Sequence, residues 1–154
     1  MEFAKFFLMM IVGTYSVFQF RHVPMKSTCC PISMQVLNYG QALFEGMKAQ
    51  RTPSGEIVLF RPTCNAERMR EGAARMSMVA PPEDLFLEGV MSAVRENAEM
   101  VPPLGKGSLY LRPLLLGTGP IIGLGPSSEY MFMVFGTAVG AYFKVRFAVP
   151  SSWR

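Results

Sequence analysis

The chain has 154 residues, about the length of one domain; half of its residues are apolar and only 17% are charged. Disordered chains show the opposite balance, so wholesale disorder is excluded. The net charge is +4, and the basic residues are spread along the chain. The composition therefore gives no support to nucleic-acid binding.

Residues that form metal sites and disulfides are few. Three cysteines (Cys29, Cys30 and Cys64) and one histidine (His22) are present. An odd number of cysteines is not the framework of a secreted disulfide scaffold, so we expect a reducing compartment. These ligands are too few for an ordinary zinc site, and we expect no metal. A catalytic triad is disfavoured because His22 lies in a segment without clear periodicity.

The first 36 residues differ in character from the rest. Residues 6–18 are apolar but fall short of the roughly 20 residues of a membrane-spanning helix, so a membrane span is not expected. Three interpretations stay open for this run: a secretory signal or anchor, an aberrant leader, and a segment packed on the domain. Residues 21–36 lack periodicity and are predicted to be a linker.

The pattern of a folded domain begins at Leu37. Residues 45–51 and 56–60 flank the sequence Thr52-Pro53-Ser54-Gly55. Proline presets φ and glycine accepts a positive φ, so this order favours a turn. We therefore predict a β-hairpin with both flanking segments as strands.

Two amphipathic helices are predicted next. Residues 65–76 place apolar side chains at helical spacing, with Thr63 or Asn65 as the N-cap. A second helix follows Pro81-Pro82, because proline in the first turn and acidic residues near the positive end of the helix dipole favour a start there. Pro102-Pro103 ends this helix.

Residues 108–116 and 130–139 are predicted to be apolar strands, separated by a loop at 117–126. The loop has the spacing of no known phosphate-binding motif. It is either a mobile surface loop or one whose Ile122 and Leu124 line a pocket. The order of two strands, two helices and two strands predicts an α+β fold, with a mostly antiparallel sheet and helices on one face.

Three polar residues are candidates for binding. Tyr110 and Arg112 share one face of a strand and could hold a carboxylate through a hydroxyl and a guanidinium, or could be an ordinary surface pair. Arg68 is expected in the first turn of its helix, where a cation opposes the helix dipole unless an anion lies nearby. A bound phosphate would explain Arg68.

Four segments closely resemble the branched-chain amino acid aminotransferases, and the plant members most of all. They are residues 37–48 (LNYGQALFEGMK), 59–62 (LFRP), 65–69 (NAERM) and 107–117 (GSLYLRPLLLG). The resemblance extends over residues 37–144 and implies a fold type IV, pyridoxal-phosphate-dependent enzyme that works as a homodimer. It places these residues in the smaller, N-terminal domain, between a divergent leader (1–36) and a divergent tail (145–154).

The resemblance also implies roles for individual residues. Arg68 matches the arginine that binds the cofactor phosphate. The residues that match the substrate site are Tyr39, Phe44, Tyr110 and Arg112, with Ile122 and Leu124 contributed across the dimer to the neighbouring pocket. An apolar pocket with few polar anchors suits leucine, isoleucine and valine and their 2-oxo acids.

The catalytic residues of the family have no counterpart here. The lysine that forms the Schiff base lies in the family's second domain, and none of the five lysines of this chain matches it. Three hypotheses follow: a truncated transaminase with little or no activity, a non-catalytic partner that pairs with a full-length relative, and a membrane-associated or exported small protein that uses residues 6–18. Plant relatives suggest a plastid or mitochondrion, although the leader resembles neither kind of transit peptide, and a cytoplasmic location stays open.

Overall fold

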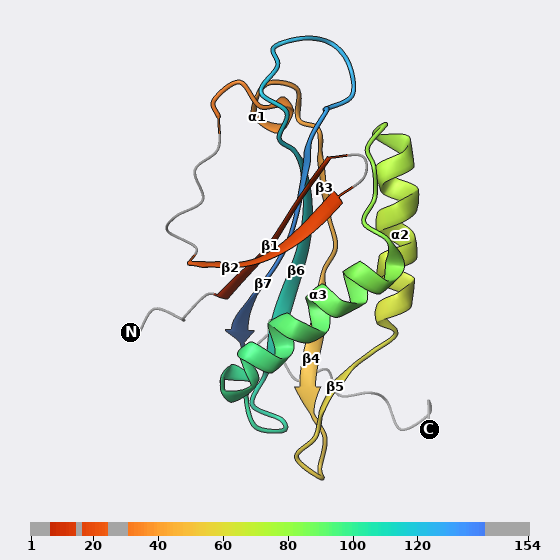
Figure 1. The fold of residues 1–154 in the computed structure, drawn as a ribbon. Helices are drawn as coiled ribbons and strands as arrows, with labels where there is room; N and C mark the ends of the chain where they lie inside the picture. The colour runs from red at the N-terminus through yellow and green to blue at the C-terminus, as the bar shows by residue number, and fades with distance from the viewer. Residues whose placement is uncertain (1–6, 15–16, 25–30, 141–154) are drawn as a thin grey trace.

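A computed structural model of the chain describes residues 7–14, 17–24 and 31–140. These residues form one seven-stranded antiparallel sheet in the order β2-β1-β7-β6-β4-β5, with β3 also paired to β6. The strands are β1 Phe7–Thr14, β2 Val17–Pro24, β3 Ala42–Phe44, β4 Met47–Arg51, β5 Ile57–Leu59, β6 Ser108–Gly117 and β7 Tyr130–Val139. Figure 1 shows the two long helices over one face of this sheet, which confirms the predicted α+β class.

The helices and the sheet enclose one main hydrophobic core. The long helices are α2 (Pro62–Arg75) and α3 (Glu83–Glu96), and the short ones are α1 (Gln35–Tyr39) and the 3₁₀ turn η2 (Ala98–Met100). Side chains alternate between faces along a strand, so β6 turns Leu109, Leu111 and Leu115 toward the helices, where they are buried. Phe86 of α3 stacks on Phe132 of β7, with ring centroids 5.6 Å apart.

The predicted hairpin is confirmed as β4 and β5. The turn closes with Gly55 N–H donating to the carbonyl of Thr52 at 2.9 Å, and Gly55 has a φ of +88°. A positive φ of this size is easy only for glycine. The strands predicted at 108–116 and 130–139 and the helix predicted after Pro82 are also confirmed.

The predicted N-cap of α2 is wrong. The helix begins at Pro62, and its N-cap is Arg61, in the left-handed region at φ +48° and ψ +53° with no capping side-chain hydrogen bond. Proline suits the first helical position because it needs no N–H there. The helix therefore starts three residues earlier than predicted, which leaves Asn65 inside it and free for other contacts.

Two N-terminal strands complete the sheet. β1 pairs with β7 from Met9 opposite Val134 to Gly13 opposite Tyr130, and β2 pairs with β1. Since β2 ends at Pro24 and α1 begins at Gln35, the connection between them is shorter than the predicted linker. Within the described part of the chain, no helix is both long enough and apolar enough to cross a bilayer. The predicted divergent tail, residues 145–154, lies outside the described residues.

Candidate functional site

The face of the sheet opposite the helices carries a polar pair. With its neighbours Leu109 and Leu111 in the core, β6 turns Tyr110 and Arg112 to this face. Arg112 donates to the hydroxyl oxygen of Tyr110 from Nη2 at 2.9 Å and from Nε at 3.3 Å. Its guanidinium carbon lies 4.1 Å from the ring centroid of Phe44, a cation–π distance. The predicted pairing on one face is confirmed, and Phe44 joins it.

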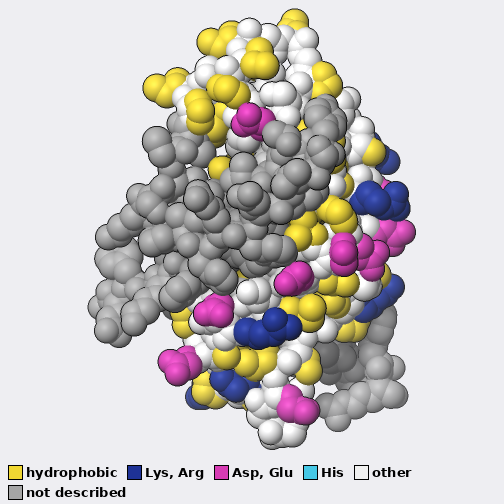
Figure 2. Space-filling view, in the orientation of Figure 1, with side chains coloured by type: hydrophobic (Ala, Val, Ile, Leu, Met, Phe, Trp, Pro, Cys, Tyr) yellow, Lys and Arg dark blue, Asp and Glu magenta, His cyan; other side chains and the backbone are white. Residues whose placement is uncertain are grey.

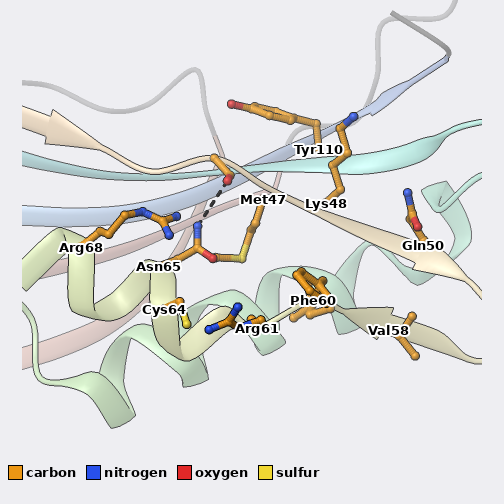
Figure 3. A pocket seen from close by; sticks show the side chains of 12 residues that line it. Met47, Lys48, Gln50, Val58, Phe60, Arg61, Cys64, Asn65, Arg68 and Tyr110 are labelled. Atoms are coloured by element: carbon orange, nitrogen blue, oxygen red, sulfur yellow. Dashed lines mark hydrogen bonds between the residues drawn. The ribbon is translucent and has the colours of Figure 1, made fainter. Parts of the chain in front are cut away.

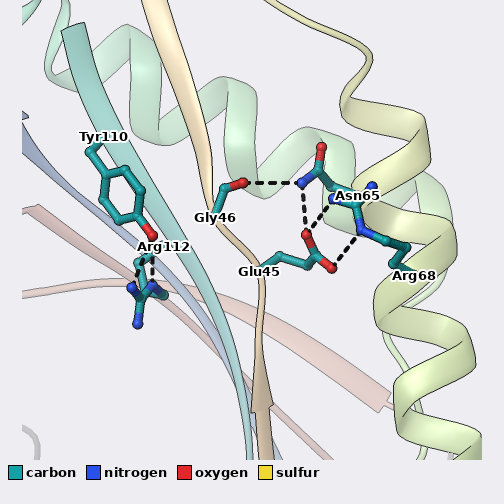
Figure 4. Close-up of polar contacts among 6 residues, drawn as sticks. All are labelled: Glu45, Gly46, Asn65, Arg68, Tyr110 and Arg112. Carbon is teal, nitrogen blue, oxygen red and sulfur yellow. Dashed lines mark hydrogen bonds and ion pairs between the residues drawn. The ribbon is translucent and has the colours of Figure 1, made fainter. Parts of the chain in front are cut away.

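Glu45 organises a second polar cluster, drawn in Figure 4. It accepts from Arg68 Nη2 at 2.7 Å and from Arg68 Nε at 3.1 Å, a bidentate ion pair. Asn65, one helical turn before Arg68, donates to Glu45 Oε2 at 2.8 Å and to the carbonyl of Gly46 at 3.3 Å. The backbone N–H of Glu45 donates to Pro113 O at 2.9 Å, which fixes the carboxylate beside β6.

The electrostatic setting of Arg68 differs from the prediction. Arg68 is the seventh residue of α2, in its second turn, because the helix begins at Pro62. Its anion is Glu45, whose hydrogen bond and negative charge raise the pKa of Arg68. The side chain of Glu45 is 13% exposed and that of Arg68 is 56% exposed. The arginine is thus held from one side and open to solvent on the other.

A groove brings Arg68 and Tyr110 together. It encloses about 870 Å³ between β4, β5 and the first turns of α2, as Figure 3 shows. Its cationic lining residues are Lys48, Arg61 and Arg68, and no aspartate or glutamate is among the residues that line it. Three cations without an acid make the groove attractive to an anion. Arg61 adds a strained backbone, a feature that is enriched at functional sites.

The remaining predicted site residues lie at the end of the sheet near α1. Tyr39 and Leu124 line a smaller pocket of about 320 Å³. Leu124 is 94% exposed, and Ile122 is also exposed, both on the loop between β6 and β7. Figure 2 shows hydrophobic side chains gathered at this end of the molecule. The predicted substrate residues therefore fall into two groups, one on the helix-free face and one at the loop.

The residues that the sequence analysis missed are those that hold the others in place. Glu45 was assigned only to a strand, and Asn65 only to a helix cap. Asn65 and Arg68 are three residues apart, so they share a helix face and could have suggested a common partner. That this partner is Glu45, twenty residues before Asn65 in the chain, depends on how α2 packs beside the end of β3.

The chain is similar to plant enzymes over most of its length. It is 57% identical over 109 residues to branched-chain-amino-acid aminotransferase 5, chloroplastic, of Arabidopsis thaliana, a match that covers 71% of this chain and 26% of that protein. It is 56% identical over 109 residues to the same plant's mitochondrial branched-chain-amino-acid aminotransferase 1, covering 71% of this chain and 28% of the relative. The chain thus spans less than a third of the length of these curated relatives. No protein-family model matches it.

Solved structures share the fold. The branched-chain aminotransferase of Thermoproteus uzoniensis, crystallised with norvaline, matches with a TM-score of 0.70 at 24% identity, over 90% of this chain and 43% of that one. A bacterial-type relative, the T.th. branched-chain amino acid aminotransferase with pyridoxamine 5′-phosphate, matches with a TM-score of 0.66 at 25% identity, over 86% of this chain and 41% of that one. The described sheet and helices therefore have the fold of a portion of these enzymes.

Proposed function

We propose that this chain, whose sequence and fold match a portion of the branched-chain aminotransferases, contributes the phosphate-binding and substrate-binding residues of such a site. The observation that carries the proposal is the groove lined by both Arg68 and Tyr110. A cation for the phosphate and a hydroxyl for the substrate meet there, in the part of the chain, residues 37–144, that we assign to the aminotransferase-like domain.

The cofactor in this proposal is pyridoxal phosphate, and the residues present fit its phosphate. Arg68 uses Nε and Nη2 on Glu45, and its guanidinium has further N–H donors for a phosphate oxygen. Glu45 fixes the plane of that guanidinium before any ligand arrives. When bound, the cofactor supplies the electron sink that amino transfer requires.

The substrate is a branched-chain amino acid or its 2-oxo acid. Arg112 and Tyr110 are polar partners for its carboxylate, and the hydrogen bond between them preorganises both. Phe44 packs on the guanidinium of Arg112 and supplies an apolar surface. Tyr39, Ile122 and Leu124 complete the apolar side of the site, with the loop residues reaching a neighbouring pocket in a dimer.

The chain alone is not expected to transfer amino groups. Its lysines are Lys5, Lys26, Lys48, Lys106 and Lys144, and none matches the family's Schiff-base lysine. The proposed function is thus to bind and orient, with the chemistry supplied elsewhere. The names of the two plant relatives favour a plastid or a mitochondrion as its location.

The experiment is to incubate the purified chain with leucine, 2-oxoglutarate and pyridoxal phosphate and to measure glutamate. We expect no glutamate above a blank without protein. A second sample, reduced with borohydride in the presence of cofactor, should carry only faint label scattered over the lysines by mass spectrometry. One lysine labelled stoichiometrically and protected by a branched-chain 2-oxo acid would contradict the proposal.

A second candidate function is that of a non-catalytic partner for a full-length aminotransferase. The observation that favours it is the exposure of Ile122 and Leu124 on one loop, because large apolar side chains at a loop tip are typical of contact surfaces. The chain should then co-purify with a co-expressed full-length relative, and Leu124→Asp should abolish this. The matched control is Leu104→Asp, an exposed leucine outside that loop. Co-purification that is unaffected by Leu124→Asp would contradict this function.

A further inference from the structure

Gln41 connects three segments that are far apart in the sequence. It follows Gly40, which ends α1 at φ +68°, and its side chain is only 8% exposed. Its Nε2 donates to the carbonyl of Met76, just after α2, at 3.0 Å. Its Oε1 accepts from the N–H of Ser127 at 2.9 Å, and its backbone carbonyl accepts from Gly117 at 2.9 Å. Both ends of one side-chain amide are thus used.

Ser127 extends this network into the loop of residues 118–129. Ser127 is 1% exposed; its hydroxyl accepts from the N–H of Gly119 at 2.8 Å and donates to the carbonyl of Glu129 at 2.7 Å. Two glycines make the close approach possible. A Cβ at Gly117 would lie 2.8 Å from Gln41 Oε1, and one at Gly119 would lie 2.8 Å from the Ser127 hydroxyl. The base of the loop is therefore held tightly while its tip is exposed.

We propose that Gln41 is a positioning residue that fixes the loop 118–129 to the C-terminal end of α2. The amide couples the placement of Ile122 and Leu124 to the helix that carries Arg68. The significance of this coupling rests on the proposed function, which assigns the substrate to the loop and the phosphate to α2. The coupling itself depends only on hydrogen bonds of this chain.

Hydrogen exchange of the loop amides tests the inference. Gln41→Met keeps the approximate shape of the side chain but leaves the buried N–H of Ser127 without its acceptor, which is costly. We expect exchange at Ser127 to accelerate about tenfold or more, a change equivalent to about 1.4 kcal/mol, while exchange at Leu111 in the core of β6 stays within about twofold. Gln50→Met, on an exposed glutamine of β4, should change neither amide.

Two further variants separate positioning from general stability. Gln41→Glu retains an oxygen acceptor for Ser127 and should keep its exchange slow. Ser127→Ala should accelerate exchange at Gly119, whose acceptor it removes. Unchanged exchange at Ser127 in Gln41→Met, or equal acceleration at Ser127 and Leu111, would overturn the inference. Because exchange requires neither cofactor nor partner, this outcome is independent of the assays for amino transfer and for co-purification.

Discussion

At the scale of single residues, Glu45 determines the geometry of the cationic groove. It accepts hydrogen bonds from Arg68 and from the buried Asn65, and its own backbone is tied to Pro113. A guanidinium that is already oriented loses less side-chain entropy when an anion binds. Arg68 is therefore prepared for a phosphate even though its charge is partly balanced by a carboxylate.

The role of Arg68 leads to a prediction about affinity. Arg68→Ala should weaken binding of pyridoxamine 5′-phosphate about tenfold or more, since a hydrogen bond to a charged group contributes about 1.5–3 kcal/mol. Isothermal titration calorimetry measures this affinity. The free energy of unfolding should fall by no more than about 1 kcal/mol, because ion pairs of exposed side chains contribute little.

Arg70→Ala is the matched control for this measurement. Arg70 is an exposed arginine of the same helix, but it is not among the residues that line the groove. Its removal should leave the affinity within about twofold of the original. Equal losses in the two variants would show that nonspecific attraction by surface charge, rather than the site at Arg68, binds the phosphate.

At the scale of the elements, β6 separates stability from binding. Its odd-numbered residues from Leu109 to Leu115 face the helices, and its even-numbered residues, Tyr110 and Arg112 among them, face away. Because the side-chain period of a strand is two, a shift of register by one residue would bury the polar pair and expose the leucines. The packing of the core thus also fixes the face on which the candidate site lies.

This alternation predicts different costs for two neighbouring leucines. Leu111 is completely buried, so Leu111→Ala should lower the free energy of unfolding by about 2–5 kcal/mol. Leu114, partly buried on the opposite face, should cost clearly less when changed to alanine. Urea denaturation followed by circular dichroism measures both. A loss for Leu114→Ala as large as that for Leu111→Ala would mean that the helix-free face is as tightly packed as the core.

At the scale of the whole molecule, the N-terminal strands determine how β7 is used. The apolar sequence of β7 would be prone to aggregate at a sheet edge. In the structure β7 lies between β1 and β6, so its backbone groups are paired on both sides. The helix-free face, by contrast, carries the polar pair and a second apolar cluster around Met131 and Met133. The molecule thus protects its most apolar strand and presents its candidate site on the opposite face from the helices.

The sequence by itself determined the local elements. The turn residues before Gly55 predict the hairpin, the helical spacing of apolar residues predicts the two long helices, and alternation places Tyr110 beside Arg112 on one face. These features depend on interactions between neighbours in the chain, which a sequence displays directly. The family motifs added the roles proposed for Arg68 and the substrate residues.

Only the tertiary structure decided which distant residues meet. An apolar run such as residues 7–14 suits several environments, and pairing with β7 makes it a strand. Gln41 and Ser127 are 86 residues apart, and Glu45 and Arg68 are 23 apart. The physical reason is that these hydrogen bonds need specific partners within about 3 Å, and only the packed sheet and helices bring those partners together.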